Sequence, residues 1–193
     1  MSTDTKDLEL LLDGNVPILV IESLEEPRVL DMLTRIAIKR AARLWVWSIT
    51  EGLNRLGFGT DPGAGTATAE PEEVLQTIKR AVDPAIYILC DFHPYITSEP
   101  KNIRLLREIA MRHQELGHTV VLLSHQLSLP GEINRYSARF ELSMPTDAQL
   151  MRLVGEEAAN WSKRRGGNVK VNSDSATLAK LVNNLRGVSL QDA

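Results

Sequence analysis

Two polar residues of this chain follow strongly apolar segments in a way that suits a nucleotide site. Asp91 ends the segment Ile86–Asp91, and Ser124 ends the segment Thr119–Ser124. A carboxylate in the place of Asp91 can hold Mg²⁺, which prefers oxygen ligands. A carboxylate that caps the turn Asp91–Pro94 is the competing interpretation. These two residues therefore suggest the hypothesis that the chain binds a nucleotide.

The segment that would bind the phosphates departs from this pattern. The apolar run Pro17–Ser23 leads directly into Leu24–Arg28, and the motif G-x-x-x-x-G-K-[ST] occurs nowhere in the chain. That motif aims backbone N–H groups at phosphate oxygens and places a lysine on the β- and γ-phosphates. Arg28 offsets one negative charge here without supplying the glycine-rich geometry. Three carboxylates near this turn would repel a triphosphate: Glu22, Glu25 and Glu26.

Other groups of reactive side chains in the sequence give weaker evidence for a functional site. Ser124 and His125 are adjacent, so on a strand they point to opposite faces and do not form a nucleophile–base pair. The loop Gly57–Ala69 is rich in glycine but contains no lysine, which favours a surface loop over a phosphate cradle. Cys90 lies inside an apolar run, and the histidines lack metal-ligand spacing, so no metal site is expected. The four histidines are His93, His113, His118 and His125.

The composition narrows the class of protein. A length of 193 residues with 43% apolar residues suits one α/β domain with a small appendage. A net charge of −3 supplies no basic field for nucleic acid. A single cysteine excludes an internal disulfide and fits a reducing cytoplasm. The polar start of the chain is unlike a signal peptide, and no apolar run approaches the roughly 20 residues of a membrane span.

The hydrophobic pattern alternates between strands and helices. Predicted strands cover Pro17–Glu22, Arg43–Ile49, Ala85–Phe92, His118–Ser124 and Arg139–Met144. Predicted helices cover Glu25–Ala42, Pro71–Val82, Pro100–Leu116, a segment that begins at the capping-box pattern Thr146–Gln149, and Ala176–Arg186. Strands separated by helices of this length imply right-handed βαβ units. We therefore expect an α/β fold with three layers and a mainly parallel sheet.

The chain is expected to divide into an α/β domain over residues 1–163, a hinge over 164–174 and a final helical segment over 175–193. The hinge is basic and then rich in Gly, Asn and Ser. Ser189–Asp192 has the pattern of a new helix start, with the serine as N-cap. This pattern indicates that the chain is a piece of a longer protein, and a frayed tail is the alternative.

The order of these features resembles the AAA+ ATPase module. Asp91 stands at the position of the Walker B aspartate, and Ser124 at the sensor-1 position. The segment that holds Arg135 and Arg139 resembles the arginine-finger region, whose residues act on a neighbouring subunit. Its arginine spacing is one residue longer than the usual R-x-x-R of the family. Ordinary surface charge is the alternative interpretation of the two arginines. The segment 178–192 resembles the start of the helical lid, so the resemblance implies a P-loop-NTPase-like fold.

More narrowly, the chain resembles the N-terminal half of a two-module AAA+ family of cyanobacteria, other bacteria and algal plastids. The matching blocks are Leu10–Asp13, Pro17–Glu22, Trp45–Gly52, Asp91–Pro94 and Leu185–Leu190. In that family a complete ATPase module follows in the same chain. Here Phe92 replaces the water-activating glutamate, and a phenyl ring neither accepts a proton nor orients water. The resemblance thus implies a module that lacks two catalytic parts.

These features predict a degenerate AAA+ module for assembly or regulation, which does not hydrolyse ATP by itself. It is expected to have no cofactor of its own, since ATP and Mg²⁺ would come only through a partner module. Its expected partners are further copies or neighbouring AAA+ modules in the cytoplasm, without nucleic acid or membrane. Alternatives are an ATPase that binds ATP in a noncanonical way, a plain protein-interaction domain, and a degenerate phospho-receiver. The receiver is disfavoured because Met144 stands where its lysine should precede Pro145.

Overall fold

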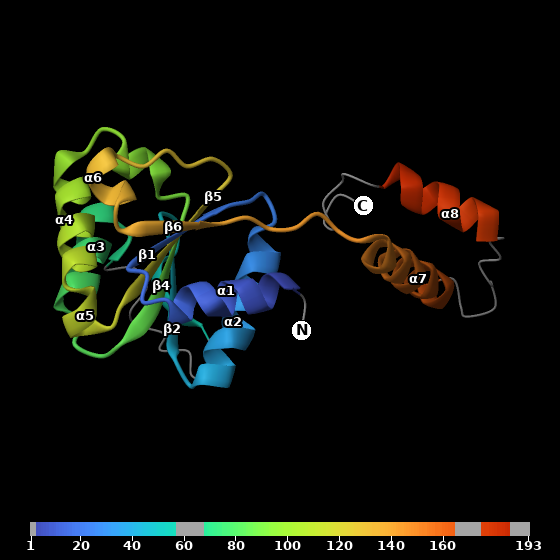
Figure 1. Cartoon of the computed structure of the whole chain (residues 1–193), viewed down its shortest axis with the longest axis horizontal. Helices are drawn as coiled ribbons and strands as arrows, with labels where there is room; N and C mark the ends of the chain where they lie inside the picture. Colours follow the sequence, from blue (N-terminus) through green and yellow to red (C-terminus); the bar gives the residue numbers. More distant parts are fainter. Residues whose placement is uncertain (1–2, 57–67, 165–174, 186–193) are drawn as a thin grey trace. The chain divides into compact units, whose positions relative to one another are not determined.

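The structure, a computed structural model, describes residues 3–56, 68–164 and 175–185, and the account below concerns these residues. The chain divides into two compact units, residues 1–142 and 143–193 (Figure 1). Each unit is described by itself. The predicted boundaries at 163 and 174 stay predictions, because the expected hinge lies almost entirely outside the described residues.

The first unit is built on a six-stranded sheet with the order β3-β2-β4-β5-β1-β6. All neighbouring pairs are parallel except β2 with β3, which is antiparallel. This arrangement confirms the predicted α/β fold with a mainly parallel sheet. The strands are β1 Ile18–Glu22, β2 Arg43–Ser48, β3 Gly52–Leu56, β4 Ala85–Cys90, β5 Thr119–Ser124 and β6 Ser137–Phe140.

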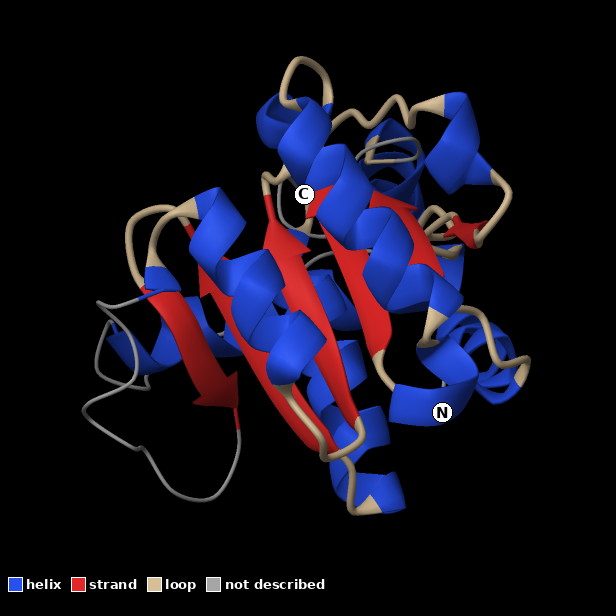
Figure 2. Cartoon of the chain, turned by 90° about the vertical axis from the view of Figure 1, so that its left-hand side faces the viewer, coloured by secondary structure: helices blue, strands red, loops and turns tan. Residues whose placement is uncertain are grey.

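Helices cover both faces of this sheet, which explains why its central strands are continuously apolar (Figure 2). Every residue of β4 and β5 is buried. One face packs against α3 (Pro71–Arg80) and α4 (Pro100–Met111), and the other against α1 (Thr3–Asp13) and α2 (Glu26–Arg40). Strand β2 alternates between the two faces, because Trp47 joins the first core and Leu44 joins the second.

Short elements complete the first unit. They are η2 (His93–Ile96), α5 (His113–Leu116) and α6 (Gly131–Asn134). The helix predicted over Pro100–Leu116 breaks at Arg112 into α4 and α5. Gly117 ends α5 with φ +66°, as expected of a glycine C-cap. A side chain there would also meet Pro84, because an added Cβ would lie 3.1 Å from the Cβ of that proline.

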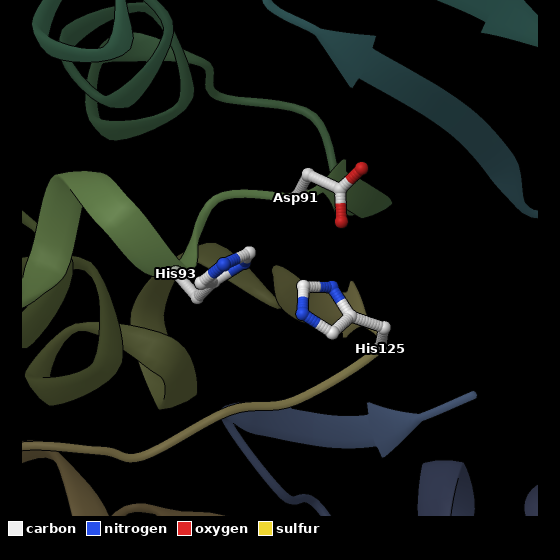
Figure 3. A group of neighbouring side chains, drawn as sticks. All are labelled: Asp91, His93 and His125. Carbon is white, nitrogen blue, oxygen red and sulfur yellow. The ribbon is translucent and has the colours of Figure 1, made fainter. Parts of the chain in front are cut away.

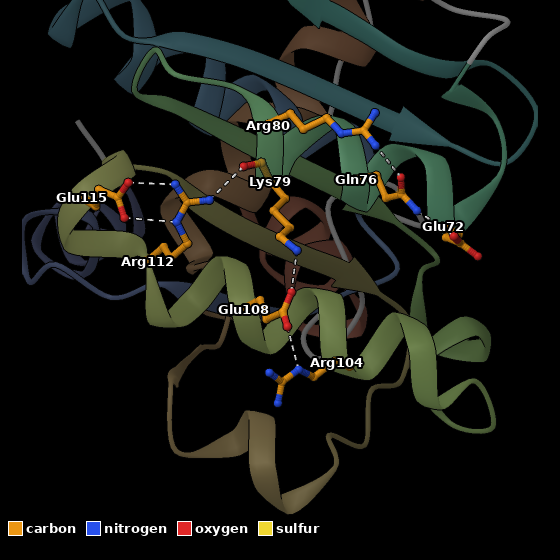
Figure 4. Close-up of polar contacts among 8 residues, drawn as sticks. All are labelled: Glu72, Gln76, Lys79, Arg80, Arg104, Glu108, Arg112 and Glu115. Carbon is orange, nitrogen blue, oxygen red and sulfur yellow. Dashed lines mark hydrogen bonds and ion pairs between the residues drawn. The ribbon is translucent and has the colours of Figure 1, made fainter.

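Ion pairs run along the outer surface of α3 and α4 (Figure 4). Lys79 of α3 donates to Glu108 of α4 at 2.6 Å, and Arg104 donates to the same carboxylate at 2.7 Å. Arg112 donates to the Lys79 carbonyl at 3.4 Å and pairs with Glu115. Exposed ion pairs contribute little to stability individually. The buried apolar contacts between these helices therefore dominate their association.

Three features of the first unit differ from the sequence prediction. Helix α1 and strand β3 were not predicted. Strand β6 covers Ser137–Phe140 rather than Arg139–Met144, because it pairs only with residues Ile18–Ile21 of β1. The strand order also shows that the phospho-receiver alternative is wrong. In the receiver fold the first strand lies between the second and third, whereas here β1 lies between β5 and β6.

The second unit contains α7 (Asp147–Arg164) and α8 (Ser175–Asn184). The predicted capping box is confirmed: the Thr146 amide donates to Gln149 Oε1 at 2.8 Å, and the Gln149 amide donates to Thr146 Oγ1 at 3.4 Å. Leu150 is fully buried. No helix among the described residues is both long enough and apolar enough to cross a membrane.

Candidate functional site

The polar residues picked out by the sequence meet at the carboxyl ends of β1, β4 and β5. Glu22 ends β1 directly beside Ser124, which ends β5. The Asp91 amide follows β4 and donates to the Leu123 carbonyl at 2.9 Å, and the Ser23 amide donates to the Ser124 carbonyl at 2.9 Å. In open α/β sheets, ligands bind outside this edge of the strands. The edge is therefore the candidate functional site.

The connection from β1 to α2 is very short. Only Ser23, Leu24 and Glu25 separate the two elements. A G-x-x-x-x-G-K-[ST] loop needs about eight residues to wrap around phosphates. The Ser23 hydroxyl accepts a hydrogen bond from the Glu25 amide at 2.9 Å, which folds the connection into a tight turn. The turn is thus too short to enclose a triphosphate.

A salt-bridge cluster lies behind this turn. Arg28 donates to Glu25 at 2.6 Å and to Asp4 of α1 at 2.7 Å. The exposed fractions of the Arg28, Asp4 and Glu25 side chains are 19%, 6% and 8%. Helix α1 therefore closes the start of α2 from outside. The sequence predicted that Arg28 offsets one of the three carboxylates near the turn. In the structure it pairs with one of them, Glu25, and also with Asp4.

Glu22, another of the three carboxylates near the turn, is also paired within the chain. Arg139 of β6 donates to Glu22 Oε1 at 2.5 Å and to the Leu127 carbonyl at 3.2 Å. The Leu127 amide donates to the same Glu22 oxygen at 3.2 Å. Arg139 therefore fastens the segment after β5 to the end of β1. The structure places this arginine, one of the two candidates for action across an interface, in an ion pair of its own domain.

The other candidate, Arg135, follows α6 and is exposed. Its guanidinium lies 4.5 Å from the ring centroid of Tyr136 and donates to the Tyr136 hydroxyl. This hydrogen bond lowers the pKa of Tyr136. No ion pair of Arg135 with a carboxylate occurs among the described residues. Its charge therefore remains available at the surface.

The two residues that follow β4 have different environments. Asp91 is exposed and has φ +50°, a left-handed conformation that Asp adopts more readily than most residues. Phe92 is fully buried and packs edge-on against Trp47 and Tyr95, with ring centroids 5.1 and 5.6 Å apart. The side chain at the expected glutamate position thus belongs to the core and faces away from the site.

Ser124 and Cys90 are both buried at the ends of their strands. Ser124 is 2% exposed, and its hydroxyl has no hydrogen-bond partner among the described residues. Burial, with a smaller contribution from the nearby Glu26 carboxylate, raises the pKa of the Cys90 thiol to about 12. A thiol with such a pKa is a poor nucleophile, so Cys90 serves as an apolar core residue.

The structure also assembles a group that the sequence analysis missed. Asp91, His93 and His125 lie together, with potential metal-ligand atoms all within 4.8 Å of one another (Figure 3). The histidine rings meet edge-on with centroids 5.0 Å apart. The spacing of the histidines in the sequence did not indicate this group, and the expectation of no metal site stays a prediction. Local spacing could not reveal the group, because its residues follow two different strands, β4 and β5, that are neighbours only in the sheet.

The strand order and the edge at β1, β4 and β5 define an AAA+-type α/β domain. Solved structures share this fold: AMPPCP-bound DnaA from Aquifex aeolicus aligns with a TM-score of 0.52 at 13% identity, covering 97% of this chain and 59% of that one. PCH-2 of C. elegans aligns with a TM-score of 0.55 at 10% identity, covering 98% and 56%. Similarity at this level of identity shows the fold alone.

The sequence identifies the family more closely. Residues 4–142 match the family of SpoVK-like AAA ATPase N-terminal domains, and the chain belongs to this family. It is 24% identical over 149 residues to the AAA domain-containing protein ycf46 of Trieres chinensis, and 25% identical over 150 residues to that of Guillardia theta. Each match covers 75% of this chain but only 29% and 28% of the relative, so the chain spans less than a third of their length.

Proposed function

We propose that this N-terminal domain serves the assembly and regulation of an AAA ATPase and does not hydrolyse ATP itself. The observation that carries the proposal is the three-residue turn after β1, which the Asp4–Arg28–Glu25 cluster closes. An active module would place a phosphate-binding loop at this turn. A domain that loses this loop retains the helices and sheet edges through which modules pack.

Several backbone donors around the turn are already committed. The Glu25 amide donates to Ser23, and the amides of Arg28 and Val29 donate to the Glu25 carbonyl. Pro27, in the first turn of α2, has no N–H group. Phosphate binding at a helix N-terminus depends on free amides that point at the anion. These donors are therefore unavailable to a triphosphate.

Arg135 is the residue best suited to act on a neighbouring module. Arg139 is held by Glu22 and the Leu127 carbonyl, whereas Arg135 is exposed and contacts its neighbour Tyr136. A guanidinium that stays charged can pair with phosphates or carboxylates of a partner. In this proposal, ATP and Mg²⁺ belong to the adjacent module, and the partners are further copies or neighbouring AAA modules.

The proposal can be tested on the full-length protein that carries this domain. Arg135→Ala should slow ATP hydrolysis by roughly 1000-fold if the arginine stabilises the transition state in trans. The matched control Arg35→Ala removes an exposed arginine of α2, whose ion pair with Asp31 is local, and should leave the rate unchanged.

Sedimentation of the same proteins separates catalysis from assembly. The wild-type protein should form oligomers, and Arg135→Ala should retain them while it loses hydrolysis. Equal rates for the two arginine variants would contradict the role of Arg135. A wild-type protein that sediments as a monomer with and without nucleotide would contradict the role in assembly.

A further inference from the structure

We propose that Asp91, His93 and His125 bind a divalent transition-metal ion, with Zn²⁺ as the representative ion. The proposal rests on side-chain geometry and does not depend on the proposed role in assembly. The three residues come from the turn after β4 and the turn after β5, and Figure 3 shows their side chains converging.

The separations fit a site that contracts slightly around an ion. The candidate ligand atoms lie within 4.8 Å of one another. In a tetrahedral zinc site, ligand atoms about 2 Å from the metal are roughly 3.3 Å apart. Asp91 and His125 are exposed, so their side chains have room to close this difference. The site would keep its fourth position for water.

The donor set selects the class of ion. Two imidazoles and one carboxylate suit Zn²⁺ and its neighbours in the first transition series. Mg²⁺ prefers an octahedron of oxygen atoms and would gain one protein oxygen here. In a nucleotide-binding protein, phosphate oxygens complete the ligands of Mg²⁺. The site described here instead uses two histidine nitrogens and therefore binds its ion without a nucleotide.

The backbone holds two of the ligands in fixed positions. Asp91 has φ +50° and its amide donates to the Leu123 carbonyl, which fixes the turn after β4 against β5. His93 begins η2, where its carbonyl accepts a hydrogen bond from the Thr97 hydroxyl at 2.9 Å. Such prior ordering lowers the entropy cost of binding an ion.

The polar atoms of the group point to a missing partner. His93 Nδ1 is shielded from solvent and has no hydrogen bond among the described residues. No hydrogen bond or ion pair joins the Asp91 carboxylate or the His125 ring to another described side chain. A buried polar atom without a partner in a folded protein calls for an explanation, and an unobserved ion is one of the standard ones. A bound cation would also tie the turn after β4 to the turn after β5.

Calorimetric titration of the untagged chain with ZnCl₂ tests the site. We expect one ion per chain, with affinity for Zn²⁺ far above that for Mg²⁺. Asp91→Asn and His125→Ala should each weaken binding by roughly 100-fold, since even outer-shell changes cost 10- to 100-fold at metal sites. Asn tolerates the left-handed backbone at position 91, so this variant removes the charge without straining the turn.

A matched control and the exposure of the test residues make the result decisive. Asp31→Asn removes an exposed carboxylate on α2 and should bind Zn²⁺ as the unmodified chain does. Both test residues are exposed, so their variants should fold even if a change at the partly buried His93 does not. Absence of binding at millimolar Zn²⁺ would overturn the proposal. Equal binding by the unmodified chain, Asp91→Asn and His125→Ala would also overturn it, and so would equal affinities for Mg²⁺ and Zn²⁺.

Discussion

At the scale of single residues, Arg28 decides the character of the turn after β1. Its guanidinium is held between Glu25 and Asp4, both of which are nearly excluded from water. Charges in such surroundings are costly unless they are paired. The cluster therefore makes the turn a stable structural element and removes the cation nearest to the absent phosphate loop.

Arg28→Met should destabilise the domain by about 3 kcal/mol, because it removes the guanidinium that pairs with two nearly buried carboxylates. Arg35→Met, which breaks the exposed pair with Asp31, should cost about 0.5 kcal/mol. Urea unfolding of both variants measures the difference. Equal losses for the two variants would show that the cluster has no special role.

His118 makes the stability of the first unit depend on pH. It is 1% exposed, its Nε2 donates to the Ala81 carbonyl at 3.0 Å, and its Nδ1 has no partner among the described residues. Burial lowers the pKa of His118, and the nearby His113 and Arg112 lower it further, against an opposing effect of the Ala81 bond. The folded state therefore binds a proton less readily than the unfolded chain does.

Because the unfolded state binds more protons, stability should fall as the pH falls below about 6.5, the ordinary pKa of histidine. The loss continues until the pH passes the lowered pKa of the folded state. In His118→Gln the free energy of unfolding should change less between pH 7.5 and pH 5. Urea unfolding at several pH values measures this slope, and an unchanged slope would contradict the assignment.

The residues at the sheet edge were only partly predictable. Asp91 and Ser124 stood out because each follows a continuous apolar run. The arrangement of Arg139 with Glu22, 117 positions apart in the chain, depends on β6 pairing with β1 and has no local signal. The contact of His93 with His125 depends in the same way on β4 lying beside β5.

At the scale of elements, segments with strong hydrophobic periodicity were predicted correctly. The elements that were missed are held in place by tertiary contacts. Strands β1, β2, β4 and β5 and helices α2, α3 and α7 follow the predicted segments closely. Helix α1 is polar on most of its surface and is held by a few contacts, such as buried Leu8 and the Asp4–Arg28 pair. Strand β3 is short, and its position depends on pairing with β2.

The turn from β4 into η2 buries the side chain at position 92, where a catalytic glutamate would need to reach the site. Phe92 packs between Trp47 of β2 and Tyr95 of η2, so restoration of a glutamate at position 92 should not restore catalysis. Phe92→Glu buries a charge without a partner and should cost roughly 4 kcal/mol or more. Phe92→Leu should cost about 1.5 kcal/mol. Thermal unfolding and an ATPase assay of both variants check this, and a stable, hydrolysing Phe92→Glu variant would contradict it.

At the scale of the whole molecule, the strand order of an AAA ATPase is combined with a closed turn where the phosphate loop belongs. The chain matches its family over residues 4–142 and spans 29% of a curated relative. In our proposal, the packing surfaces of the fold remain useful while a neighbouring module carries the nucleotide. The central claim is that this domain has no nucleotide site of its own.

Calorimetric titration of the chain with Mg-ATP and Mg-ADP tests this claim most directly. The account predicts no binding heat up to millimolar nucleotide, because the turn is too short and several of its amides are engaged. Binding in the micromolar range would contradict the account and favour an ATPase with a noncanonical site. In that case, Arg28 would be the first residue to substitute.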